Sequence, residues 1–216
     1  MSEPGGLRTL KKERTRNAIA DAAIRLFLAN GFDQVSVAEI AAAAEVSKPT
    51  LFRYFASKEE LVLHQIADHQ GEFGRVVRSR AAGETPLAAL RRHYLARLAE
   101  RDPITGLCTD PEVLAFRRLV YETPSLSSHL LDYMAADSDA LAQALAEAVT
   151  EAGGAASELT ARLVAAQCLG MHQTLAFTNW SRLAAGTPLP EAADRAVADA
   201  DTAFALLGSG AEAYGY

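Results

Sequence analysis

The sequence predicts an all-α protein with an N-terminal three-helix domain and a larger helical C-terminal domain. Half of the 216 residues are apolar but only 7% are aromatic, and alanine, the residue with the highest helix propensity, is abundant. Apolar residues recur at i, i+3, i+4 and i+7, without the alternation that strands show. Two S-x-x-E capping boxes, at 36–39 and 57–60, mark helix starts in the first third of the chain.

Residues 1–10, with one proline and two glycines, are expected to form a flexible arm. The helix that follows has its apolar residues on one face and ends at Asn30 and Gly31, a pair typical of a helix C-terminus. Its beginning carries a basic cluster, Lys11, Lys12 and Arg14. Contact with phosphates or the minor groove and an ordinary solvated helix start both account for this cluster.

Two short helices, 37–44 and 48–55, are expected next, separated by a turn of about three residues. Ser36 caps the first, and Ser47 caps the second, which has Pro49 in its first turn. Helices joined so tightly cross steeply, as in a helix-turn-helix unit whose second helix enters the major groove of DNA. A further capping box then starts a third helix with Lys58 at its first position, which favours an anion there.

The second of these helices has a surface suited to phosphates and base edges. Leu51 and Phe55 share its apolar face, and the other positions carry cations, a hydroxyl and a phenol but no carboxylate. Residues 1–80 hold twelve Lys and Arg against ten Asp and Glu, a net +2, whereas the remainder has a net −8. The residues expected to contact DNA are Lys11, Lys12, Arg14, Ser36, Val37, Ser47, Lys48, Pro49, Thr50, Phe52, Arg53, Tyr54 and Lys58.

Residues 14–63, and above all the run VSVAEIAAAAEVSKPTLFRYFASKEEL, resemble the tetracycline-repressor (TetR) family of bacterial transcription regulators. Glu45 stands where the family pattern has glycine, which makes the turn less permissive. Phe52 stands where a phosphate-contacting tyrosine is common, so a hydroxyl hydrogen bond is lost. The resemblance implies a homodimer in which the last two long helices of each subunit form a four-helix bundle.

The remaining chain is expected to be helical throughout. The third helix is predicted to continue as a connecting helix over 58–80, between a DNA-binding domain at 11–57 and a ligand-binding and dimerisation domain at 81–208. Proline and glycine stops predict further helices at 86–101, 111–122, 125–151, 157–185 and 190–207, followed by a frayed tail at 209–216.

The last two helices carry apolar and small side chains that would allow a second helix pair to approach closely. The candidate dimer residues are Leu163, Gly170, Ala193, Val197, Ala200 and Phe204. Packing inside a single chain accounts equally well for each of them.

Polar and aromatic side chains within apolar helices are typical of a small-molecule pocket, although each of them is also common in an ordinary protein core. The candidates for an unknown effector are Tyr94, Phe116, Tyr121, Tyr133, Met134, Met171, His172, Phe177 and Trp180.

No catalytic, metal or cofactor site is expected. None of the five histidines follows a glutamate by three residues, as a di-iron bundle requires, and nucleotide-binding and hydrolase motifs are missing. The two cysteines, Cys108 and Cys168, have no metal-ligand spacing. With no export signal or membrane-spanning run, we expect a cytoplasmic protein with no membrane partner.

The expected function is that of a ligand-responsive transcriptional regulator. A homodimeric repressor would bind a palindromic double-stranded DNA operator and be released by a small-molecule effector. A transcriptional activator, or a helical ligand- or partner-binding dimer without DNA binding, are the alternatives.

Overall fold

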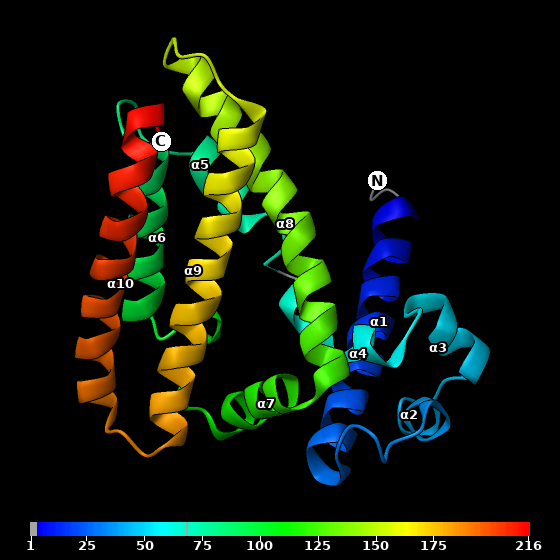
Figure 1. The fold of residues 1–216 in the computed structure, drawn as a ribbon. Coiled ribbons are helices and arrows are strands. Elements are labelled where there is room, and N and C mark those ends of the chain that lie inside the picture. The colour runs from blue at the N-terminus through cyan, green and yellow to red at the C-terminus, as the bar shows by residue number, and fades with distance from the viewer. Residues whose placement is uncertain (1–3, 68) are drawn as a thin grey trace. The chain divides into compact units, whose positions relative to one another are not determined.

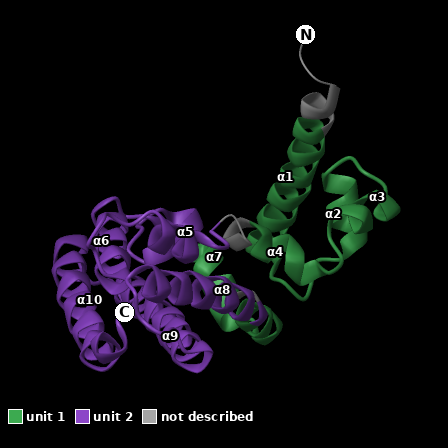
Figure 2. Cartoon of the chain, turned by 90° about the horizontal axis from the view of Figure 1, so that it is seen from above, with its two compact units in different colours: residues 1–68, 115–131 green, residues 69–114, 132–216 purple. Residues whose placement is uncertain are grey.

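The computed structural model describes residues 4–67 and 69–216, and over these residues it is helical with no strand, which confirms the all-α prediction (Figure 1). The chain divides into two compact units (Figure 2). Unit 1 comprises residues 1–68 and 115–131, and unit 2 comprises residues 69–114 and 132–216. The third N-terminal helix therefore belongs to the first unit, together with a segment from the middle of the chain that we expected in the second.

Unit 1 is built from four N-terminal helices and parts of two later ones. The N-terminal four are α1 (Pro4–Asn30), α2 (Val37–Ala43), α3 (Lys48–Tyr54) and α4 (Lys58–Ala67). Both α7 (Pro111–Glu122) and α8 (Pro124–Glu151) run from one unit into the other. The core of unit 1 contains Phe27, Ile40, Leu51 and Phe55 and is completed by apolar side chains of these two helices, Val120 and Leu126 among them.

Helix α1 begins at Pro4, so the expectation of a flexible arm over 1–10 is wrong for the described part of that segment. Proline at the first helical position loses nothing by lacking an N–H, because that group has no partner within the helix. The following glycines lower helix propensity but do not prevent hydrogen bonding along the helix.

The helix-turn-helix has the caps that the sequence predicts. The Ser36 backbone N–H donates to Glu39 Oε2 at 2.7 Å, and the Glu39 N–H donates to Ser36 Oγ at 3.2 Å. At the end of α2, Val46 N–H donates to the Ala41 carbonyl and Glu45 N–H to the Ala42 carbonyl, the pattern of a Schellman motif. Glu45 takes a left-handed conformation there, with φ of +54°.

The single connecting helix predicted over 58–80 is wrong, because it is broken into α4 and α5 (Glu72–Arg78). Gly71, with φ of +72°, leads into α5, and its N–H donates to Asp137 Oδ1 at 2.7 Å. The break directs the side chain of Glu72, the first residue of α5, into the interior of unit 2, where it is bound by three cationic or imidazole groups described below.

Unit 2 contains α5, α6 (Pro86–Ala99), the short helix η1 (Pro103–Thr105), α9 (Glu158–Ala184) and α10 (Leu189–Ala211), with the C-terminal part of α8. Helix α10 lies beside both α9 and α6 (Figure 1). The interior includes Leu90, Tyr94, Leu145, Ala165 and Ala200. Among the described residues, no helix is both long and apolar enough to span a membrane.

The C-terminal tail is folded, contrary to the expected fraying. Helix α10 continues to Ala211, and η2 covers Glu212–Tyr214. The Tyr216 side chain is buried, and its hydroxyl lies 3.0 Å from Thr160 Oγ1. A buried aromatic ring and this hydrogen bond together order a tail whose glycines and alanines suggested mobility.

Candidate nucleic-acid interface and candidate ligand site

Helix α3 is fixed to unit 1 at both of its ends. Ser47 Oγ accepts a hydrogen bond from the Thr50 N–H at 3.2 Å and lies 2.8 Å from the Thr50 hydroxyl. At the other end Phe55 is buried, and Leu51 is buried on the inner face. The α3 side chains on the opposite face are thereby held on a supported helix.

That outer surface carries six of the residues predicted to contact DNA. Lys48, Pro49, Phe52 and Arg53 are exposed, and Thr50 and Tyr54 are partly exposed. The Arg53 guanidinium lies 5.5 Å from the centroid of the Tyr54 ring. Because α3 contains no carboxylate, its outer surface offers cations and hydrogen-bond donors without a competing anion.

The neighbouring elements add further predicted residues. Ser36 is exposed and Val37 partly exposed at the start of α2, and Lys11, Lys12 and Arg14 are exposed on α1. Ser57 Oγ accepts from the Glu60 N–H, but Glu60 binds the N–H of Ala56 instead of that of Ser57, so the second capping box is displaced by one residue.

The Lys58 ammonium lies against aromatic rings of its own unit. Its Nζ lies 4.3 Å from the centroid of the Phe32 ring and 5.5 Å from that of Phe27. A cation–π contact of this kind attracts the ammonium to the ring face. To contact DNA, Lys58 would have to leave this contact or share it.

In unit 2 the structure brings together two of the predicted ligand residues, Tyr94 and His172. The His172 ring centroid lies 4.9 Å from that of Tyr94, 4.5 Å from Phe73 and 6.0 Å from Phe204. Burial lowers the pKa of His172 to about 3, so the imidazole is neutral near neutral pH. Its Nε2 has no hydrogen-bond partner among the described residues.

Next to this aromatic cluster, Glu72 binds side chains from α6 and from its own segment. Glu72 Oε1 lies 2.8 Å from Arg97 Nη2 and 3.0 Å from His93 Nε2, while Oε2 lies 2.8 Å from His69 Nδ1. Burial opposes ionisation of Glu72, but hydrogen bonds from His69 and Arg97 outweigh it and hold the carboxyl pKa below its usual value.

Burial also determines the pKa of two neighbouring groups. It lowers the pKa of His93 despite the nearby Glu72 carboxylate. It raises the pKa of Asp137, although the Gly71 N–H partly compensates. Arg97 also binds Asp102 Oδ2 at 3.1 Å, so the network ties α5 to α6 and to the start of η1.

The other predicted ligand residues do not form one site. Met134 and Met171 pack against the core of unit 2, whereas Phe116 and Tyr121 belong to unit 1. The Phe177 and Trp180 rings are tilted against each other with centroids 5.7 Å apart, and the Trp180 indole N–H donates to the Leu114 carbonyl at 3.3 Å. The side chain of Tyr133 lies outside the described residues.

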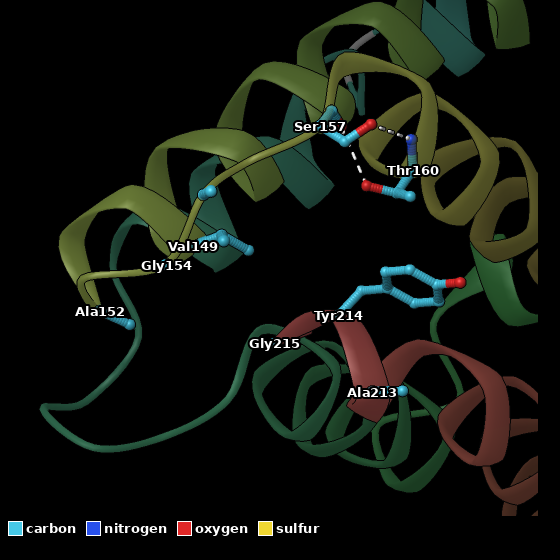
Figure 3. A pocket seen from close by; sticks show the side chains of 9 residues that line it. Val149, Ala152, Gly154, Ser157, Thr160, Ala213, Tyr214 and Gly215 are labelled. Atoms are coloured by element: carbon cyan, nitrogen blue, oxygen red, sulfur yellow. Dashed lines mark hydrogen bonds between the residues drawn. The ribbon is translucent and has the colours of Figure 1, made fainter.

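A surface hollow of about 410 Å³ lies where the end of α8, the start of α9 and the C-terminal segment meet (Figure 3). None of the predicted ligand residues lines it. Of its polar side chains, Ser157 caps α9, and the Thr160 hydroxyl lies near the Ser157 carbonyl and Tyr216. The Tyr214 phenol is a further polar side chain that lines the hollow (Figure 3).

The predicted dimer residues divide into two groups. Ala200 and Phe204 are 0% and 5% exposed within the single chain, so assigning them to a subunit interface is wrong. Leu163 and Val197, by contrast, are 50% and 43% exposed. Gly170 and Ala193 are partly exposed, and a Cβ added at Gly170 would meet no atom within 4 Å.

Sequence reasoning missed Phe73, Glu72 and His93 as members of the unit 2 cluster. Phe73 and Glu72 lie in the segment predicted as a continuous connecting helix, and only the break at Gly71 directs them inward. A glycine inside a helical pattern was the available signal, but it does not say where the following residues point.

The described residues hold no group of three or more His, Cys, Asp or Glu side chains arranged to bind a metal ion. Cys168 is buried, which raises its thiol pKa to about 12, so the thiolate required for metal binding or nucleophilic attack is disfavoured.

Comparison with known proteins identifies relatives over different parts of the chain. Residues 19–64 match the sequence profile of the family described as bacterial regulatory proteins, tetR family. The HTH-type transcriptional regulator TcmR of Streptomyces glaucescens is 39% identical over 127 residues, which cover 58% of this chain and 56% of TcmR. This match therefore spans just over half of that relative's length.

MftR of Mycobacterium tuberculosis, a transcriptional regulator provisionally named for mycofactocin biosynthesis, is 28% identical over 80% of this chain and 82% of MftR. Among solved structures, FadR of Bacillus subtilis in complex with stearoyl-CoA aligns with a TM-score of 0.53 and 22% identity. That alignment covers 89% of this chain and 97% of FadR, and it supports the fold. Neither sequence relative is named as an enzyme, in agreement with the lack of catalytic motifs in this chain.

Proposed function

Because this chain belongs to the TetR family of bacterial regulatory proteins, we propose that it regulates transcription by binding double-stranded DNA through α3. The observation that carries the proposal is the outer surface of α3. Lys48 and Arg53 are exposed there, Thr50 is partly exposed, and the helix contains no carboxylate. Phosphate contacts would position the helix, and base-edge contacts in the major groove would select the sequence.

The test begins by selecting DNA from a random pool with the full-length protein and measuring affinity for the recovered sequence by gel shift. Arg53→Ala should weaken binding by about 1–3 kcal/mol if Arg53 reads a base edge. Arg25→Ala is the matched control, because it removes the same charge from an exposed position of α1 in the same unit. Equal affinities of wild type and Arg53→Ala would contradict the proposed interface.

Lys58 should behave differently from a base-reading residue. If its ammonium leaves the Phe32 ring to bind a phosphate, Lys58→Ala lowers affinity for all sequences and reduces the salt dependence of binding by about one counterion. If the ammonium stays on the ring, the variant loses stability while its salt dependence remains that of the wild type.

We further propose that the regulator is a homodimer. On α9, Leu159, Leu163, Ala166, Gly170, Thr174 and Phe177 share one face, which we call the α9 outer face; their spacing of three or four residues aligns them. Leu159, Leu163 and Phe177 are 66%, 50% and 47% exposed, and the face has no charge. The Thr174 hydroxyl donates to the Gly170 carbonyl and so needs no water. A second copy would bury this apolar surface.

A two-fold dimer would recognise a palindromic operator with half-sites about one helical turn, ~34 Å, apart. DNA selected from the random pool should therefore contain an inverted repeat. Repression is proposed as the outcome, and a reporter gene placed behind the selected operator distinguishes it from activation. Expression that falls when the protein is supplied supports repression, and expression that rises shows an activator.

Release by a small-molecule effector completes the proposal. FadR, which has a similar fold, was solved in complex with stearoyl-CoA, and this supports a small-molecule effector. In the present chain the aromatic cluster around His172 is the proposed location. An effector would act through its different affinity for the DNA-binding and DNA-free states, with a coupling of about 1–3 kcal/mol.

A further inference from the structure

The Nε2 atom of His172 is buried among aromatic rings and has no hydrogen-bond partner within the described part of the chain. The Tyr94 and Phe204 rings meet it nearly edge-on, with interplanar angles of 84° and 89°, and Phe73 meets it tilted at 48°. Apolar residues would fill this space without the cost of desolvating a ring nitrogen. A buried polar atom without a partner therefore requires an explanation other than packing.

Asn179, two turns further along α9, provides a comparison. Its Oδ1 is also buried without a partner, but its Nδ2 donates to the Thr105 carbonyl at 2.9 Å and so connects α9 to η1. His172 Nε2 makes no hydrogen bond to any described residue. Its nitrogen is thus available to a bound molecule in a way that the Asn179 amide is not.

The chemistry of the site restricts what can bind. Burial keeps the His172 imidazole neutral, so Nε2 presents either a lone pair or an N–H, depending on the tautomer. A hydroxyl both donates and accepts and therefore complements either tautomer. A carboxylate is disfavoured, because the imidazole carries no charge and the Glu72 carboxylate is electrostatically coupled to it.

The surrounding rings select the body of the ligand. Tyr94 and Phe204 are 3% and 5% exposed, whereas Phe73 is partly exposed. The Phe73 ring is thus the one of the three that a ligand can displace from the solvent side. A planar aromatic molecule would replace its contact with the imidazole.

We infer that His172, with Tyr94 and Phe204, recognises an uncharged planar aromatic molecule that takes the place of the Phe73 ring and binds His172 Nε2 through a hydroxyl group. The inference rests on the proposed function, because it assigns a chemical class to the small-molecule effector proposed there. It also specifies which residues the effector contacts, and so it can fail independently of DNA binding.

The experiment measures binding of 2-naphthol to the full-length protein by thermal shift and calorimetry. Naphthalene, which lacks the hydroxyl, and 2-naphthoate, which carries a charge, are the comparison compounds. We expect a saturable rise in Tm with 2-naphthol and at least a tenfold weaker effect with either comparison compound. Absence of a saturable shift with 2-naphthol, or equal binding of all three compounds, overturns the inference.

Variants test whether 2-naphthol binds at His172 Nε2. His172→Phe keeps an aromatic ring but removes Nε2, so its affinity for 2-naphthol should fall by roughly tenfold, the effect of one buried hydrogen bond. Gln167→Ala, at an exposed position of the same helix, is the control and should bind as the wild type does. His172→Phe should also melt at a higher temperature than the wild type without ligand. A lower melting temperature would show that His172 is a structural residue and would overturn the inference.

Gel shifts separate this inference from the proposed function. A protein that binds its selected operator but not 2-naphthol retains the DNA-binding role and loses the ligand inference. A protein that binds 2-naphthol through His172 but binds no DNA retains the site and loses the role in transcription.

Discussion

Two residues other than glycine have a positive φ among the described residues, and both follow the end of a helix. Glu45 takes a positive φ of 54° in the turn between α2 and α3, and Arg101 takes 56° after α6. At Arg101 the N–H groups of Arg101 and Asp102 donate to the carbonyls of Leu98 and Arg97, so both turns end a helix by the same hydrogen bonds. Glycine adopts this conformation without the steric cost that a Cβ brings.

We therefore predict that Glu45→Gly stabilises the protein. Relief of the left-handed strain, ~1–2 kcal/mol, exceeds the ~0.5–1 kcal/mol that glycine adds to the unfolded-state entropy, so unfolding free energy should rise by up to about 1 kcal/mol. Urea unfolding measures the change. Glu39→Gly, which removes another acidic residue but breaks the Ser36 capping box, should instead destabilise. A Glu45→Gly protein less stable than the wild type would show that the side chain has a role that its exposure does not reveal.

His172 makes stability depend on pH. Its pKa is about 3 in the folded protein and ~6.5 when unfolded, so below pH 6.5 the unfolded state binds a proton that the folded state does not. The contribution of this group to stability should therefore be constant above about pH 7 and fall by about 2 kcal/mol between pH 7 and pH 5. The lowered pKa of His93 acts in the same direction.

Unfolding measured at pH 7 and pH 5 tests this prediction, with His172→Phe as the comparison. In the variant, the loss of unfolding free energy between pH 7 and pH 5 should be smaller by the contribution of His172. The contribution of His93 should remain. Identical pH dependence in the two proteins would mean that the His172 pKa is the same in the folded and the unfolded protein.

Among the elements, η1 and α9 make the closest backbone approach found at any glycine that the structure describes. Gly106 ends η1 with φ of +77°, and a Cβ there would overlap the carbonyl oxygen of Ala176. Beside it, Asn179 donates to the Thr105 carbonyl, and Thr105 is itself fully buried. The turn therefore packs against α9 through backbone atoms, which cannot rearrange as side chains do.

Gly106→Ala should destabilise the protein strongly, and Gly83→Ala is the matched control. Gly83 has a similar φ of +80° but no atom within 4 Å of an added Cβ. Gly83→Ala should cost ~1–2 kcal/mol from backbone strain alone, whereas Gly106→Ala should cost several kcal/mol more because α9 and η1 must separate. Chemical denaturation of both variants measures the difference. Equal losses would mean that the η1 turn moves away from α9 at little cost.

At the scale of the whole molecule, the distribution of apolar surface separates a core from a face available for assembly. Ala200 and Phe204 on α10 belong to the core of unit 2, but Leu159, Leu163 and Phe177 on the α9 outer face are exposed. A helix with apolar residues on both its inner and its outer face is expected to be covered on both.

Leu163→Arg should dissociate the proposed dimer, because it places a charge in the middle of the α9 outer face. We expect the dimer dissociation constant to rise on the order of 100-fold, with operator affinity falling in parallel. Leu131→Arg is the control, since Leu131 is an exposed leucine of unit 1 at 58% exposure. Sedimentation of both variants gives the answer, and a Leu163→Arg protein that remains dimeric would move the interface to another surface.

Ala200→Arg separates the core from the proposed interface. Ala200 is fully buried inside the chain, so a charged side chain there should unfold unit 2 instead of yielding a folded monomer. Circular dichroism at low temperature distinguishes the two results. A folded monomer would restore Ala200 to the subunit interface.

Features that depend on neighbouring residues along the chain could be predicted from the amino-acid sequence. The Ser36–Glu39 capping box, the Ser47 cap and the exposed cations of α3 follow from residues only a few positions apart. Helix caps and helical periodicity are local interactions, and the all-α class and the helix-turn-helix could therefore be derived without a structure.

Which faces of the helices are covered, and which distant groups meet, depends on tertiary packing and could not be predicted from the sequence. The break at Gly71, the assignment of 115–131 to unit 1 and the burial of Ala200 each depend on contacts between residues far apart in the chain. His172 meets Phe73, Tyr94 and Phe204 for the same reason. An amphipathic pattern gives the apolar side of a helix but not its partner, because many packings bury similar apolar area and only shape and polar pairing distinguish them.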